Sequence, residues 1–180
     1  MARSDEECRR LLSCLTQPRY RLCFSLMYGC GLRIGEAVAL PISAIDSSQR
    51  LLRIVGKGDK ERAVGLPESL LEPMREFWKT HRHPEWLFPS ATGLRPFATK
   101  MAGQAFRKAR EIAGLDIRFT PHVLRHSYAT RLIEQGTPLP VVQTLLGHAS
   151  IRSTQRYTHL TDPLRRDVQA TVDRLFAGLS

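Results

Sequence analysis

The sequence has no stretch that could act as a signal peptide or cross a membrane. Charged residues between Arg3 and Glu7 occupy the position where a signal peptide needs an apolar region. The longest apolar run, Leu22 to Leu32, is too short to span a bilayer and contains a serine and two glycines. Internal repeats and low-complexity segments are also missing. We therefore expect a cytoplasmic protein with no membrane association.

Cysteine is scarce and shows no metal-binding or redox pattern. The four cysteines all lie within the first thirty residues, no two of them form a C-x-x-C motif, and their neighbours are apolar. Such cysteines are typical of buried, reduced thiols in an intracellular protein. The sequence thus predicts neither a disulfide framework nor a cysteine-bound metal.

Acidic side chains are few compared with basic ones. The chain has 17 Asp and Glu against 27 Lys and Arg, a formal net charge of +10, and the segment from Arg95 to Arg131 holds eight basic and two acidic residues. This excess would attract a polyanion, although a basic composition alone also fits general solubility. DNA is one candidate polyanion, and Lys100, Arg107 and Lys108 are the basic residues expected to contact it.

Helical periodicity dominates the rest of the chain. It predicts helices over 5–15, 18–29, 33–40, 68–81, 99–113, 121–135, 138–146 and from 163 onward. The predicted apolar face of the helix over 99–113 is the line Met101, Ala105, Ala109 and Ile112. The β-rich runs 51–55 and 62–66 flank a glycine-containing basic loop and predict a hairpin, whereas 84–96 is expected to be a surface connection. The expected fold class is α+β, mainly helical with a small antiparallel β-sheet, in one domain spanning 1–180.

The most informative segment begins at Pro121. A helix that starts there places His122 and Arg125, three residues apart, on one face. A second helix ends just before His148, and Tyr157 comes nine residues later. Arginine and histidine side chains near a helix start can bind a phosphate, and a phenol beside them can attack it. The spacing therefore predicts a site for phosphodiester cleavage.

Five elements, in this order, resemble the motifs of the tyrosine recombinases, which are phage-integrase-type site-specific recombinases. They are the first arginine motif at 31–36, the lysine-bearing hairpin at 56–62, His122-x-x-Arg125, Leu146-Gly147-His148 and Tyr157. The resemblance extends from about Asp5 to the C-terminus. It implies the fold of a recombinase catalytic core and the recombination of double-stranded DNA.

The resemblance also implies a role for each site residue. Arg33 and Arg125 would grip the non-bridging oxygens of the scissile phosphate and offset the charge of the transition state. His122 would be a base or hydrogen-bond partner for the tyrosine, and His148 would donate to a phosphate oxygen. Tyr157 would form a 3′-phosphotyrosyl intermediate, so that rejoining needs neither a nucleotide cofactor nor a metal.

Three further residues have implied roles with simpler alternatives. Lys57 would be the general acid for the departing 5′ oxygen, or else a solvated loop lysine. Lys60 lies close enough to take that role, and is otherwise expected to bind DNA. Glu36 would orient its catalytic neighbours, or form a surface salt bridge one helical turn from Arg33. His122 and His126 have the spacing of a zinc pair, but no cysteine or carboxylate follows at ligand distance, so no metal is expected.

The resemblance covers only the catalytic region of the family. Most members carry an additional N-terminal helical domain that clamps the DNA, and we expect that core-binding domain to be absent here. The resemblance implies a monomer in solution and a homo-tetramer on DNA. Two other functions stay open, namely a type IB topoisomerase-like nicking-closing activity and a DNA-binding remnant that no longer cleaves. The last helix could pack on its own domain or dock on a neighbouring protomer through the stripe Leu164, Val168, Val172 and Leu175.

Overall fold

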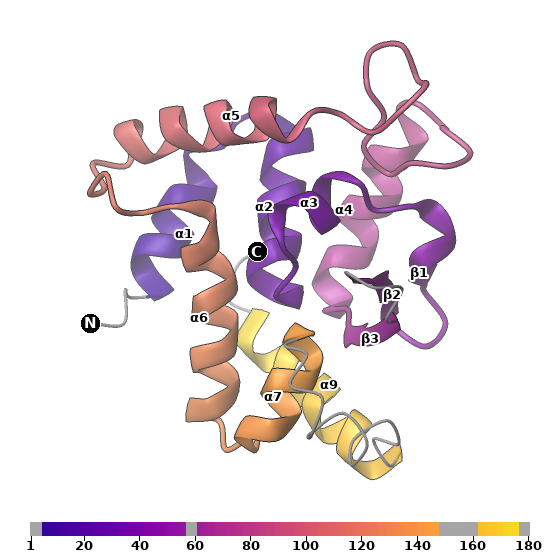
Figure 1. Cartoon of the computed structure of the whole chain (residues 1–180), viewed down its shortest axis with the longest axis vertical. Helices are drawn as coiled ribbons and strands as arrows, with labels where there is room; N and C mark the ends of the chain where they lie inside the picture. The colour runs from indigo at the N-terminus through magenta and orange to yellow at the C-terminus, as the bar shows by residue number, and fades with distance from the viewer. Residues whose placement is uncertain (1–4, 57–60, 148–161, 177–180) are drawn as a thin grey trace.

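Helices form most of the molecule, and a small antiparallel sheet lies at one side of them (Figure 1). The computed structural model describes residues 5–56, 61–147 and 162–176. The described helices are α1 Asp5–Ser13, α2 Pro18–Cys30, α3 Ile34–Val38, η1 Ile42–Ala44, α4 Glu68–Lys79, α5 Thr99–Ile112, α6 Pro121–Glu134, α7 Leu139–Leu146 and α9 Asp162–Phe176. The described strands are β1 Ile45–Asp46, β2 Leu51–Val55 and β3 Glu61–Gly65.

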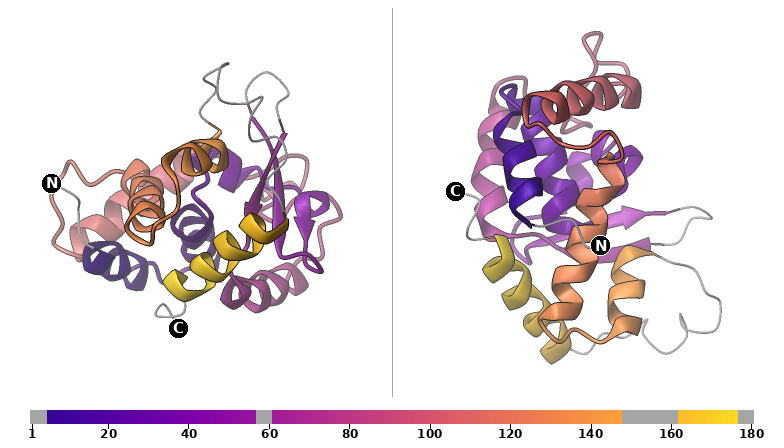
Figure 2. Two further views of the ribbon diagram at one scale, coloured as in Figure 1. Left: turned by 90° about the horizontal axis from the view of Figure 1, so that it is seen from below. Right: turned by 90° about the vertical axis from the view of Figure 1, so that its left-hand side faces the viewer.

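α2 lies at the centre of the helices and contacts α1, α3, α4, α5, α6 and α9 (Figures 1 and 2). It is buried on most sides because apolar residues continue from Leu22 to Cys30. It ends at Gly31, whose φ of +64° is the left-handed conformation that glycine adopts most easily. The ring of Tyr128 lies so close to Gly31 that a Cβ there would clash with it. The chain can therefore turn directly from the central helix toward Arg33.

The sheet has the strand order β1-β2-β3, and both pairs are antiparallel. β2 and β3 form the predicted hairpin, with Leu52 opposite Val64 and Ile54 opposite Arg62. Opposite residues point to the same face of a sheet, so Arg62 lies on the face that carries these buried apolar side chains. The sequence does not predict β1, because two residues are too few to show a strand's alternation.

The predicted helices are confirmed, but the apolar face assigned to α5 is wrong. The buried residues of this helix are Ala102, Phe106 and Ala109, while Met101 and Ile112 are exposed. Phe106 decides the orientation because its ring packs against Phe24 at 5.1 Å and Phe119 at 6.2 Å between centroids. The face is thus set by the one large aromatic side chain, which the line of smaller residues did not include.

The connection over 84–96 was predicted to lie on the surface, but part of it is buried. Leu87 and Phe88 are fully buried, and the Phe88 ring packs against Phe77 and Phe97. An isolated antiparallel bridge pairs Trp86 of this segment with Pro41. A second bridge, between Pro89 and Pro96, lies within the segment. Prolines can occupy such edge positions because they have no N–H to donate.

α9 packs against its own domain (Figure 2). Its residues Val168, Val172 and Phe176 are buried in the main core, in contact with α2, α4, α6 and β3. Gly29 of α2 allows this approach, because a Cβ there would lie 2.5 Å from the Phe176 ring. Asp173 accepts hydrogen bonds from Arg50 at 2.6 Å and from the Glu68 N–H at 3.1 Å. Of the two expected arrangements, the structure has the self-packed one for Val168 and Val172, while the side chains of Leu164 and Leu175 lie outside what the structure describes.

The helices and the cysteines of the described residues bear on two of the expectations. No helix within these ranges combines the length and apolar character needed to cross a bilayer. The four cysteines are free, and Cys8, Cys23 and Cys30 are buried in the core. Burial raises the pKa of the Cys8 thiol, as expected for an unreactive core residue.

Candidate active site

Two arginines that lie far apart in the sequence meet beside one carboxylate. Arg33 immediately precedes α3, Arg125 lies in the second turn of α6, and Glu36 of α3 lies between them. The Arg33 Nη1 donates to Glu36 Oε1 at 2.9 Å, and the Arg125 Nη1 lies 4.0 Å from Glu36 Oε2. The structure thus brings together the two residues predicted to bind the scissile phosphate.

The C-terminal end of α7 completes this cluster. Arg125 donates to the carbonyl oxygens of Gly31, at 2.6 Å, and of Leu146. The Arg33 Nη2 lies 3.4 Å from the Gly147 carbonyl oxygen. Carbonyl groups at a helix C-terminus carry partial negative charge and favour such cations. α7 ends one residue, Gly147, before His148, so the arginines contact the helix from which the chain continues to the remaining motifs.

A third arginine, Arg62 of β3, was not singled out from the sequence. Its Nη1 and Nη2 donate to the two carboxylate oxygens of Glu36 at 2.9 and 2.7 Å, and its Nε donates to the Leu145 carbonyl at 2.9 Å. The sequence does contain a sign that Arg62 is buried. Arg62 lies two residues before Val64, a buried residue, and side chains two residues apart point to the same face of a strand. An arginine on the apolar face of a strand needs an acidic or carbonyl partner.

Glu36 accepts hydrogen bonds from both sides. Besides the Arg62 and Arg33 guanidinium groups, the backbone N–H of Arg33 donates to Glu36 Oε2 at 2.7 Å. Burial alone would raise the pKa of Glu36, but the hydrogen bonds from Arg62 and then from Arg33 outweigh it, so the net shift is downward. Glu36 therefore has the predicted orienting position and also forms the alternative salt bridge with Arg33.

The cluster holds more positive charge than its single carboxylate can balance. Three guanidinium groups face Glu36, and burial, followed by the charges of Arg33 and Arg62, lowers the pKa of Arg125 to about 10. Arg125 is still protonated at neutral pH. The Arg33 side chain is 41% exposed, compared with 10% for Arg125, so an external ligand can reach it. An anionic group such as a phosphate diester, which carries one negative charge, would reduce this repulsion.

His122 and His126 are exposed on α6, in its first and second turns. Nowhere in the described ranges do three or more His, Cys, Asp or Glu side chains come together as a metal site requires. Lys100, Arg107 and Lys108 are exposed along α5, as a DNA-contacting surface needs. Four predicted site residues lie outside the described residues, namely Lys57, Lys60, His148 and Tyr157.

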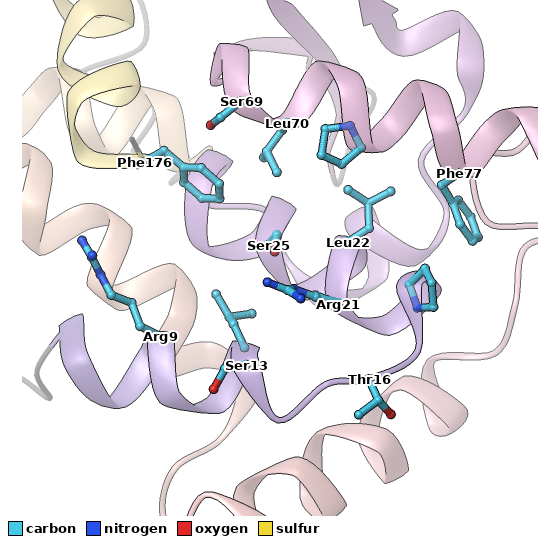
Figure 3. Close-up of a pocket in the computed structure, with 13 residues that line it drawn as sticks. Arg9, Ser13, Thr16, Arg21, Leu22, Ser25, Ser69, Leu70, Phe77 and Phe176 are labelled. Atoms are coloured by element: carbon cyan, nitrogen blue, oxygen red, sulfur yellow. The ribbon is translucent and has the colours of Figure 1, made fainter. Parts of the chain in front are cut away.

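A separate pocket lies among α1, α2, α4 and α9 (Figure 3). It has a volume of about 690 Å³ and is lined mainly by apolar side chains such as Leu22 and Phe176, together with Arg9 and Arg21. None of its lining residues belongs to the arginine cluster. The arginine cluster, in which Arg33 is the exposed member, is therefore distinct from this pocket.

A family model matches most of the sequence. The model of the phage integrase family matches residues 4–163. The chain belongs to the phage integrase family. The matched range contains residues 31–36, residues 56–62, His122, His148 and Tyr157, and the arginine cluster joins the first two of these segments to α6.

Known members of the phage integrase family resemble the chain in sequence and in fold. A putative integrase/recombinase, y4qK of Sinorhizobium fredii, is 38% identical over 158 residues, which cover 87% of this chain and 51% of the relative. Tyrosine recombinase XerD of Proteus mirabilis is 38% identical over 174 residues, covering 87% of this chain and 54% of XerD. The XerH site-specific recombinase, solved bound to its difH substrate before cleavage, superposes with a TM-score of 0.73 at 27% identity, covering 92% of this chain and 52% of XerH. The chain spans about half the length of these relatives.

Proposed function

We propose that this chain is the catalytic domain of a site-specific recombinase that cuts and rejoins double-stranded DNA. The observation that carries the proposal is the meeting of Arg33 and Arg125, with excess positive charge, at the end of the helix that leads to His148. The similarity to a recombinase solved on its substrate supports the same kind of ligand. The basic composition and the exposed Lys100, Arg107 and Lys108 of α5 fit a DNA surface.

In the proposed reaction, the Tyr157 oxygen attacks the scissile phosphorus and the bond to the 5′ oxygen breaks. Arg33 and Arg125 bind the non-bridging oxygens and offset the charge that develops on them. Lys57 gives a proton to the departing 5′ oxygen, His122 accepts or shares the phenol proton, and His148 donates to the phosphate. The 3′-phosphotyrosyl ester keeps the energy of the broken bond, so rejoining needs no nucleotide or metal.

The other tyrosines support Tyr157 as the nucleophile. Tyr28 and Tyr128 are buried in the core, and burial raises the pKa of both phenols. Tyr20 packs against Phe97 at 5.9 Å between ring centroids. Tyr128 lies beside Gly31 and near Arg125, but its side chain is 1% exposed and is therefore closed to a DNA strand. The cytoplasmic location, the tetramer on DNA and the additional DNA contact by Lys60 belong to the same proposal.

The proposal can be tested with a library of genomic DNA fragments that carry single nicks. A nick next to the cleaved bond lets a short strand diffuse away and traps the covalent protein–DNA species. We expect the wild-type chain to form this species in the presence of a chelator, and Arg125→Ala to lose it. Release of the adduct by a 5′-hydroxyl strand would show rejoining. DNA binding without an adduct would indicate the binding remnant, and relaxation of supercoiled DNA without strand exchange would indicate the topoisomerase-like activity.

A further inference from the structure

The guanidinium of Arg62 is buried and hydrogen-bonded to the protein, unlike that of an arginine that binds DNA or lies in solvent. Its side chain is 7% exposed, and all three guanidinium nitrogens donate to the protein, two of them to Glu36 and one to the Leu145 carbonyl. The two parallel bonds to one carboxylate match the planar fork of a guanidinium, and a lysine cannot reproduce them. Each nitrogen of Arg62 thus has an internal partner, and the side chain presents little surface to an external phosphate.

We propose that Arg62 is a positioning residue that fixes the phosphate-binding side chain of Arg33 through Glu36. Both carboxylate oxygens of Glu36 accept from Arg62, and both also accept from Arg33, one from its guanidinium and one from its backbone N–H. Once the fork of Arg62 sets the plane of the carboxylate, the direction of the Arg33 guanidinium follows. This inference rests on the proposed function, because its effect is read in DNA cleavage.

The same residue joins three elements of the site. Arg62 lies in β3, its carboxylate partner lies in α3, and its carbonyl partner lies in the last turn of α7. Gly147 provides the space, since a Cβ there would lie 3.2 Å from Arg62 Cδ and Nη1, and its φ of +64° also ends α7. Among the described residues, the Arg33 guanidinium has just the weak 3.4 Å contact to Gly147 besides its bond to Glu36. Its orientation therefore depends on Glu36, and that of Glu36 depends on Arg62.

The first test compares Arg62→Lys and Arg62→Met with the wild type on a DNA fragment trapped in the genomic experiment. At saturating DNA, we expect single-turnover cleavage to fall by about 10²-fold, as a misplaced binding group can cost. DNA affinity should change less than threefold, because Arg62 does not reach the DNA. Arg53→Met is the matched control on the neighbouring strand, since its side chain is 57% exposed and lies 3.5 Å from Asp46, away from Glu36. Its cleavage rate should equal that of the wild type.

A second measurement tests whether Arg62 affects cleavage through Arg33 or through the loop that carries Lys57. Arg62 follows Lys57 by only five residues, so its loss could act through that proposed general acid. When the 5′ bridging atom of the substrate is sulfur, the departing strand leaves as a thiolate and needs no proton. We expect Arg62→Lys to remain slow on this substrate. Recovery of the wild-type rate would overturn the inference, because Arg62 would then act through Lys57.

A third measurement separates positioning from simple stability. Thermal unfolding of Arg62→Lys, Arg62→Met and Glu36→Gln gives the temperature range in which each variant is folded, and cleavage is measured within that range. Cleavage should stay slow in each folded variant, because the chain of bonds that orients Arg33 is broken. A wild-type cleavage rate in folded Arg62→Met would overturn the inference. Wild-type cleavage with unimpaired Arg62 variants would refute this inference alone, whereas a wild type that forms no adduct would refute the proposed function and, with it, this role.

Discussion

The guanidinium of Arg125 donates a hydrogen bond to the carbonyl oxygen of Leu146, the last residue of α7. The same guanidinium donates to Gly31 at the end of α2. The residue proposed to bind the phosphate therefore also ties together two helix ends, one that precedes the first arginine motif and one that precedes His148. The fold and the proposed phosphate site therefore share one side chain.

This double role predicts that Arg125→Lys damages both stability and cleavage. A lysine cannot span the two carbonyl oxygens, so we expect the free energy of unfolding to fall by about 1.5–3 kcal/mol. Single-turnover cleavage should fall by about 10²–10³-fold, because charge stabilisation of the transition state is lost. Urea unfolding and the trapped-adduct assay measure the two effects. Arg110→Lys, which removes a surface bond to the Ile117 carbonyl, is the control and should change neither.

Glu36 should make stability depend on pH in the acid range. Its pKa is lowered in the folded state, so its contribution is complete above the ordinary value of 4.5 and is lost as the pH falls through the lower folded value. We expect the unfolding free energy of the wild type to exceed that of Glu36→Gln at pH 7. This difference should shrink as urea unfolding is repeated between pH 5 and pH 3. A difference that stays constant over this range would contradict the hydrogen-bonded, ionised carboxylate.

The packing of α9 predicts that removing it destabilises the monomer. Phe176 is buried and packs beside Tyr28, so Phe176→Ala should lower the free energy of unfolding by about 3–5 kcal/mol. The exposed Leu139→Ala should stay within about 0.5 kcal/mol of the wild type. Truncation after Asp162 should then abolish cooperative unfolding. An unchanged thermal midpoint with failed assembly on DNA would instead favour docking of this helix on a neighbouring protomer.

Gly31 is a position where a methyl group should not be tolerated. Its backbone is left-handed and the Tyr128 ring occupies the place of a Cβ. We expect Gly31→Ala to cost more than about 1 kcal/mol, the penalty for the left-handed conformation alone. Gly103→Ala is the matched change in the middle of α5, where a Cβ would meet nothing within 4 Å. It should stabilise the chain by about 0.5–1 kcal/mol, and thermal unfolding of both variants checks the contrast.

The sequence predicts the parts of this molecule that local patterns determine. Helix starts at Pro18 and Pro121, the stop at Gly147 and the β2–β3 hairpin follow from residue type and spacing, and all are confirmed. The family resemblance pointed to Arg33 and Arg125, which the fold brings together. Their roles in chemistry stay predictions.

Contacts between distant segments explain what was missed. Arg62 meets Glu36 and Leu145 at separations of 26 and 83 residues, and no local pattern contains these partners. The wrong face of α5 has a similar cause, because Phe106 is directed by Phe24 and Phe119 from other parts of the chain. A rule that gives large aromatic residues priority over small ones would have corrected the helix, but the partner of Arg62 depends on the tertiary fold.

Mapping the residue that carries DNA in the trapped adduct tests the central claim most directly. Wild-type adduct would be digested with protease and nuclease and analysed by mass spectrometry, with Tyr157→Phe and Tyr20→Phe as the paired variants. The account predicts a nucleotide attached through a 3′ phosphate to the peptide that contains Tyr157, a free 5′-hydroxyl on the released strand, and loss of the adduct only in Tyr157→Phe. A nucleotide on any other residue, or attachment through a 5′ phosphate, would contradict it.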